Sequence, residues 1–97
     1  MIEDASVFVP ASRIAYRRIG DQVVLVAPDD NVLLTLNTTG SAVWEGLDAG
    51  QSVVEIAATL EQEFAVSADQ ALQDVVAFVE LMLERALVER VTADRET

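Results

Sequence analysis

The first third of the chain follows the two-residue period of β-strands. Residues 13–18 alternate apolar and polar side chains, and residues 23–27 and 32–36 are apolar and rich in β-branched side chains. A Gly-Asp pair at 20–21 and a turn that begins with proline at 28–31 separate the three segments. Connections this short join antiparallel neighbours, so we predict a three-stranded antiparallel meander.

After residue 37 the apolar residues are spaced as in α-helices. The first helix is predicted to run from Thr38 to Leu47 and to end before an Asp-Ala-Gly run. The second is predicted to begin after Ser52, because the hydroxyl of this residue can form a capping box with Glu55. Its apolar residues then follow the i, i+3, i+4 spacing of one buried stripe.

The third predicted helix has a wider apolar face than the second. It opens with Ser67 and Gln70 in the capping arrangement and is predicted to extend to about Ala86. Its apolar sector is about 160° wide at 100° per residue. One row of this sector is predicted to cover the core: Leu72, Val76, Val79, Leu83 and Ala86.

A second apolar row lies beside the first on the same helix. It is formed by Ala71, Val75, Phe78 and Met82. A central helix that contacts both the sheet and the other helices explains the extra width. A second explanation is a groove beside an edge strand, in which an extended peptide pairs with the backbone and places side chains in apolar pockets. The two explanations are compatible, since one helix can do both.

Composition limits the classes of function. The chain has 97 residues, 52% of them hydrophobic, and a net charge of −11. This is enough apolar material for one compact domain, so the acidity belongs to the surface. Only six arginines and no lysine oppose seventeen acidic residues, which argues against a phosphate-binding surface.

No catalytic or cofactor motif is found in the sequence. Histidine and cysteine are absent, which removes the usual nucleophiles, bases and zinc ligands. The four glycines form neither a phosphate loop nor a dinucleotide motif, so we expect no enzyme activity, cofactor or metal. Residues 1–11 read as an N-terminal arm without a signal peptide or membrane anchor, and residues 91–97 as a tail. We therefore expect a cytoplasmic protein.

The junction between the third strand and the first helix suggests a family. Residues 36–44 read LN-x-x-G-x-x-x-W, and residues 52–56 and 74–81 follow at matching spacing. Over residues 12–90 the chain resembles the PqqD-like family, whose members are recognition elements for ribosomally synthesised and post-translationally modified peptides. The resemblance implies an α+β, winged-helix-like fold, with a three-stranded antiparallel β-sheet followed by three α-helices.

The resemblance also implies a peptide-binding site. In the family, the leader segment of a precursor peptide is added as an extra strand against the third strand and faces the third helix. By position, the strand residues are Val32, Leu33, Leu34, Thr35 and Leu36. The helix residues carried over in the same way are Ala71, Leu72, Val75, Phe78, Val79 and Met82. The implied partners are the leader peptide and a modifying enzyme such as a radical SAM enzyme, a leader protease or a cyclase.

Some family features are missing. The glycine after the first helix comes one position late, at Gly50, and Ala86 stands where a glycine is common. Features associated with the pyrroloquinoline quinone pathway, a cysteine and a Gly-Trp pair, are also absent. The length of the chain is similar to that of discrete recognition proteins of other pathways, including lasso peptides.

Two other functions fit the same pattern. A winged helix often binds DNA, although the only basic cluster, Arg13, Arg17 and Arg18, falls on the first strand and not on a recognition helix. A structural adaptor subunit of an enzyme complex also needs an exposed edge and an apolar groove. Saturable binding of a short peptide would separate an adaptor from a leader-binding protein.

Overall fold

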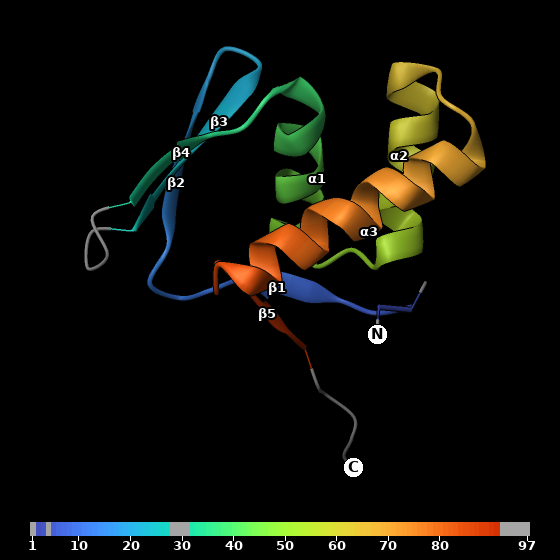
Figure 1. The fold of residues 1–97 in the computed structure, drawn as a ribbon. Coiled ribbons are helices and arrows are strands. Elements are labelled where there is room, and N and C mark those ends of the chain that lie inside the picture. The colour runs from blue at the N-terminus through green and yellow to red at the C-terminus, as the bar shows by residue number, and fades with distance from the viewer. Residues whose placement is uncertain (1, 4, 28–31, 92–97) are drawn as a thin grey trace.

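The protein is described by a computed structural model covering residues 2–3, 5–27 and 32–91. Four strands come first in the chain, three helices follow, and a fifth strand comes after the last helix (Figure 1). The turn predicted at 28–31 and most of the predicted tail lie outside the described residues. The elements are β1 (Phe8–Pro10), β2 (Ala15–Ile19), β3 (Gln22–Ala27), β4 (Val32–Thr35), α1 (Thr38–Asp48), α2 (Val53–Phe64), α3 (Ala68–Glu84) and β5 (Val88–Arg90).

The predicted α+β fold is confirmed. Strands β2, β3 and β4 form an antiparallel sheet in the order of the chain, and the three helices follow. The β2–β3 turn contains Gly20, whose φ of 64° lies in the left-handed region that glycine adopts without strain. This turn sets the register in which Ile19 faces Gln22.

Side chains cap the helices much as the sequence predicts. Ser52 accepts a hydrogen bond from the backbone N–H of Glu55, whose carboxylate accepts one from the N–H of Ser52. At α3, Ser67 accepts from the N–H of Gln70 in the same way. The Gln70 side chain, however, donates to Asp74 one turn along the helix, so only half of the second predicted box forms.

The face of α3 that is buried differs from the predicted one. The predicted core row is wrong at its end, because Leu83 is 37% exposed and Ala86 lies beyond the helix with a φ of 58°. Leu72 and Val76 are only half-buried. The fully buried stripe is Ala71, Val75, Val79 and Met82, three of which belong to the predicted second row.

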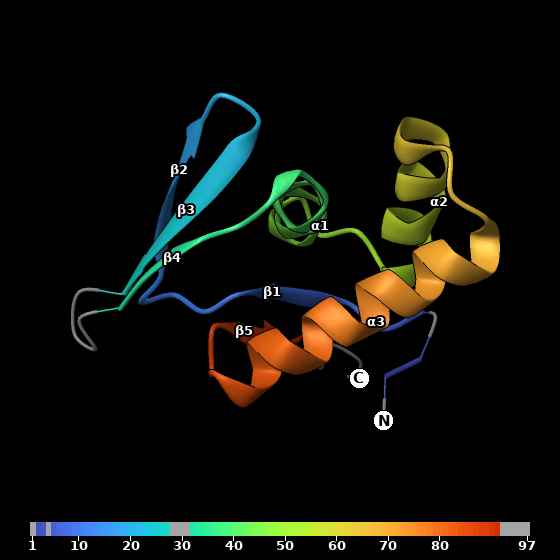
Figure 2. The ribbon, with the colours of Figure 1, turned by 45° about the horizontal axis from the view of Figure 1, so that its top comes forward.

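Residues of the predicted N-terminal arm form part of the core. Strand β1 pairs with β5 in an antiparallel two-stranded sheet, and Phe8 is fully buried. A further backbone hydrogen bond joins the N–H of Ala11 to the carbonyl of Leu87. The paired strands β1 and β5 therefore lie together against the helices, with β1 in contact with α1 and β5 in contact with α3 (Figure 2).

Helix α1 packs on one face of the β2–β3–β4 sheet. Tyr16 lies edge-on to Trp44, with 6.0 Å between the ring centroids, and donates a 2.7 Å hydrogen bond to Asp48. That hydrogen bond is the main cause of a raised Tyr16 pKa, to which burial and the charges of Asp48 and Glu45 add. Arg18, two residues further along the same face, pairs with Glu45 at 2.6 Å.

Candidate functional site

Within the described residues, strand β4 is an edge of the sheet, and its backbone groups point alternately toward β3 and away from it. The N–H of Leu36 donates to the carbonyl of Val23 at 2.8 Å, and Leu34 lies opposite Leu25 two residues earlier. Because hydrogen-bonded pairs alternate in an antiparallel ladder, the intervening residue Thr35 directs its N–H and carbonyl to the free side. Leu33, two residues before Thr35, does the same.

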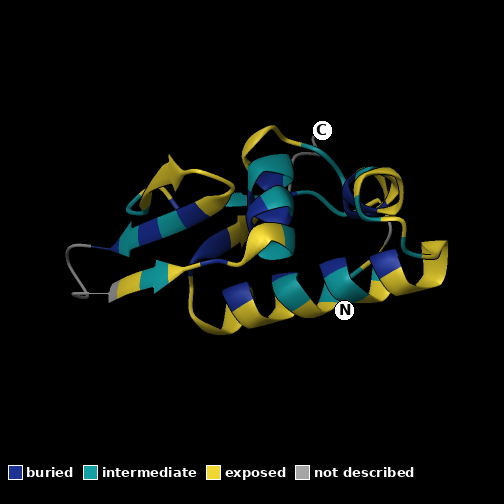
Figure 3. Ribbon diagram, turned by 90° about the horizontal axis from the view of Figure 1, so that it is seen from above, coloured by how far each residue is buried: buried dark blue, intermediate teal, exposed yellow. Residues whose placement is uncertain are grey.

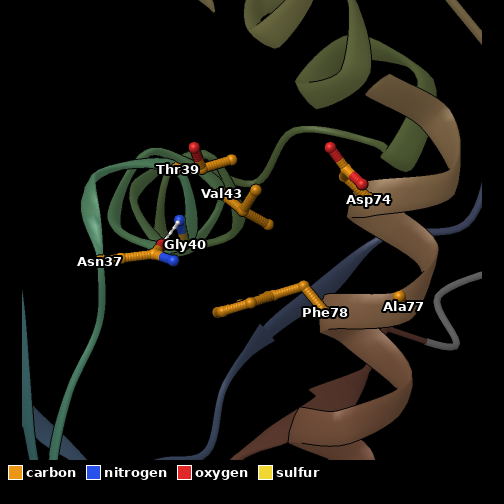
Figure 4. Close-up of a pocket in the computed structure, with 7 residues that line it drawn as sticks. All are labelled: Asn37, Thr39, Gly40, Val43, Asp74, Ala77 and Phe78. Carbon is orange, nitrogen blue, oxygen red and sulfur yellow. Dashed lines mark hydrogen bonds between the residues drawn. The ribbon is translucent and has the colours of Figure 1, made fainter. Parts of the chain in front are cut away.

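A cavity of about 360 Å³ opens where β4 leads into α1, between α1 and α3 (Figure 4). Val43 and Phe78 point toward one another across it, one from each helix. Val43 is buried, whereas Phe78 keeps part of its ring exposed. The complete lining is Asn37, Thr39, Gly40, Val43, Asp74, Ala77 and Phe78.

The junction motif holds the cavity in shape. Asn37 caps α1 by accepting a 2.7 Å hydrogen bond from the N–H of Gly40. A Cβ atom on Gly40 would lie 3.2 Å from the ring of Phe78, so the glycine permits close approach of α1 and α3. The buried hydroxyl of Ser41 accepts from Val23 and donates to the carbonyl of Leu36, which fixes the start of α1 on the sheet.

The chemistry of the cavity suits binding. Val43, Ala77 and Phe78 give it apolar walls, Asn37 and Thr39 are polar, and Asp74 is the one charged residue in the lining. An oxygen of this carboxylate accepts a 2.8 Å hydrogen bond from the Gln70 amide. Among residues 2–3, 5–27 and 32–91, no group of three or more acidic side chains is placed to hold a metal ion. No helix in this part of the chain is long and apolar enough to cross a membrane.

The predicted strand residues lie at the free edge, with different exposures. The side chain of Leu33 is 73% exposed, and that of Thr35 is also exposed. Leu34 is half-buried and Leu36 is in the core, which leaves their side chains on the side of the helices. Val32 begins β4, and its side chain is outside the described part of the structure.

Of the predicted helix residues, Phe78 alone lines the cavity. Leu72 lies on the other flank of α3, in a hollow of about 170 Å³ shared with α2. The remaining four are at most 1% exposed and cannot touch a peptide without rearrangement of the core: Ala71, Val75, Val79 and Met82.

Sequence reasoning missed several cavity residues. Asn37 and Gly40 were present in the junction motif, but their position beside α3 depends on how the helices pack. Asp74 and Ala77 lie four residues and one residue before Phe78, so helical spacing from Phe78 would have found Asp74. Figure 3 shows how burial is distributed along α3, with buried residues on the side that faces the rest of the domain and exposed residues on the outer side.

Comparisons with known proteins agree with this fold. The family model for coenzyme PQQ synthesis protein D (PqqD) matches residues 22–88. The chain belongs to the PqqD family, within which it forms a small winged-helix-like domain. No curated protein sequence matches the chain.

Two solved structures share the fold. The first, described as TbiB1 in complex with the TbiA(beta) leader peptide, has a TM-score of 0.78 and 20% identity, covering 91% of this chain and 99% of that one. The second is described as lasso peptide synthetase B1 complexed with the leader peptide. It has a TM-score of 0.77 and 23% identity, covering 84% of this chain and 95% of that one.

Proposed function

We propose that this protein is a non-catalytic recognition element that binds the leader segment of a ribosomally synthesised precursor peptide. The observation that carries the proposal is the free edge of β4, which ends beside the cavity lined by Val43 and Phe78. Membership of the PqqD family supports it, as do two proteins of the same fold that are described with leader peptides.

In this proposal, backbone pairing contributes affinity for the leader and insertion of a leader side chain contributes selectivity. A leader segment that adds to β4 exchanges hydrogen bonds with Leu33 and Thr35, which contributes affinity with little dependence on sequence. A leader side chain that enters the cavity against Phe78 supplies selectivity. The chemistry is then performed by the enzyme to which the leader is presented, such as a radical SAM enzyme, a leader protease or a cyclase. We place this step in the cytoplasm, where precursor peptides are made.

Proline at position 35 tests the backbone pairing. Thr35→Pro removes the N–H that points to the free side while leaving the β3–β4 hydrogen bonds in place. We expect it to weaken leader binding about tenfold, from the lost hydrogen bond and the bulk of the ring at the edge. The measurement is fluorescence anisotropy of a labelled synthetic leader peptide.

Thr35→Val is the matched control, because it changes the same side chain and keeps the N–H. It should bind the leader as the wild type does. Thermal melts of both variants check that the sheet is intact. Equal leader affinity in Thr35→Pro and the wild type, with both folded, would refute binding at this edge.

The DNA-binding alternative finds little support in the arrangement of charge. Arg18 is paired with Glu45, and Arg13 donates to the carbonyl of Ala86. Leader binding through backbone pairing and a cavity with one charged residue should change little with salt, whereas duplex DNA binding should weaken steeply. Tight binding of duplex DNA at physiological salt would favour this alternative over ours.

A further inference from the structure

The β2–β3–β4 sheet has a second face, opposite to α1, and most of its residues are apolar. Directly paired residues share a face, and the pairs place Ala15, Val26 and Leu33 in one row across the three strands. The next row contains Arg17, Val24 and Thr35, and the last contains Ile19 and Gln22. The outer face is defined by these eight residues: Ala15, Arg17, Ile19, Gln22, Val24, Val26, Leu33 and Thr35.

No described helix or strand covers the outer face. In Figure 2 the three helices lie on one side of the sheet and its other side is open. Ile19 is 60% exposed and Leu33 is 73% exposed. An antiparallel sheet with one solvated face normally turns polar residues outward. Five of the eight outer-face residues are apolar here, and they are contiguous across the three strands, which is typical of an interaction surface.

The positive charge of Arg17 on the outer face indicates what kind of partner would bind there. Arg17 is its one charged residue, and in the described part of the chain it forms no ion pair or hydrogen bond, whereas Arg18 on the inner face is paired with Glu45. A cation left unpaired on a chain of net charge −11 calls for a carboxylate on the partner. A second copy fits poorly, because stacking two outer faces would oppose Arg17 to itself between two acidic molecules.

The outer face also continues into the proposed leader site. Alternate side chains of a strand project to opposite faces, so a leader segment added to β4 would place every second side chain next to Leu33 on the outer face. A partner resting on this face would therefore contact both the protein and the bound leader.

We propose that the outer face is the docking surface for the enzyme that modifies the precursor peptide. The enzyme's contact surface is apolar and carries a carboxylate opposite Arg17, and it touches the outward side chains of the bound leader. This inference rests on the proposed function. Because the leader forms part of the surface, it raises the affinity for the enzyme, and by linkage the enzyme raises the affinity for the leader by the same factor.

Two substitutions on β2, at the edge opposite β4, test the proposal. Ile19→Glu and Arg17→Glu each place a carboxylate on the outer face, distant from the leader edge. Val54→Glu is the matched control, because Val54 is a β-branched residue that is 47% exposed on α2. The probes are the labelled leader and the purified enzyme that modifies the same precursor peptide.

We expect both β2 variants to bind the enzyme at least about tenfold more weakly in the presence of saturating leader. Their affinity for the leader alone should stay at the wild-type value, and Val54→Glu should change neither quantity. Wild-type enzyme affinity in both β2 variants, with leader binding intact, would overturn the docking surface and leave leader recognition standing. Absence of leader binding in the wild type would overturn the proposed function itself.

Sedimentation of the wild type measures its oligomeric state, which shows whether a second copy of the chain, and not the enzyme, occupies the outer face. We expect a monomer, given the charge of the chain. A dimer that Ile19→Glu dissociates and Val54→Glu does not would overturn the proposal in favour of self-association through the outer face.

Discussion

Replacing Phe8 with alanine is expected to lower the free energy of unfolding by about 3–5 kcal/mol, as for other fully buried phenylalanines. Phe8 has no exposed surface and belongs to the main hydrophobic cluster, and the guanidinium of Arg90 lies 4.9 Å from its ring centroid. Truncation would leave a cavity in the main hydrophobic cluster. Urea unfolding followed by the fluorescence of Trp44, the only tryptophan, measures the change.

Leu83→Ala is the comparison for Phe8→Ala. Leu83 is 37% exposed near the end of α3, so its truncation should cost about 1 kcal/mol or less. The sequence alone predicts the reverse order, since it places Leu83 in the core and Phe8 in an arm. A larger loss for Leu83→Ala than for Phe8→Ala would contradict the packing described here.

Phe78→Ala is expected to weaken leader binding by about tenfold or more, because an aromatic wall of a binding cavity is commonly a hot spot. The ring of Phe78 is partly exposed and faces Val43 across the cavity, so it is available to a ligand. Its loss should cost less stability than the loss of Phe8. Leader titrations and thermal melts on the same variant separate the two effects.

Leu72→Ala is the control on the same helix. Leu72 is also half-buried, but it lines the hollow between α2 and α3 and not the cavity. We expect a modest loss of stability and unchanged leader affinity. If Leu72→Ala weakened binding more than Phe78→Ala did, the site would lie on the α2 flank of α3.

The elements with strong local signals could be predicted from the sequence. The meander and helix starts follow from two-residue alternation, turn residues and the capping hydroxyl of Ser52, all of which act over a few neighbouring residues. Strands β1 and β5 have three residues each, too few to show a period. They pair across nearly the whole chain, with Phe8 opposite Arg90, and no local pattern encodes that contact.

The site was predicted in part for the same reason. The edge strand follows from its place at the end of the meander. The wide apolar sector of α3 indicates that the helix contacts both the core and a groove, but not which row of side chains makes each contact. That depends on how α1, α2 and β5 pack against the helix. The sequence places both Phe78 and Val75 in the second apolar row, but in the structure Phe78 lines the cavity and Val75 lies in the core.

Residue-resolved amide hydrogen exchange with and without leader peptide tests the central claim most directly. The N–H groups of Leu33 and Thr35 point to the free side of β4, whereas those of Leu34 and Leu36 already face β3. A leader strand on β4 should therefore slow exchange at Leu33 and Thr35 far more than at Leu34 and Leu36. Saturating leader that leaves Leu33 and Thr35 unprotected, or that protects the opposite edge at β2, would contradict the account.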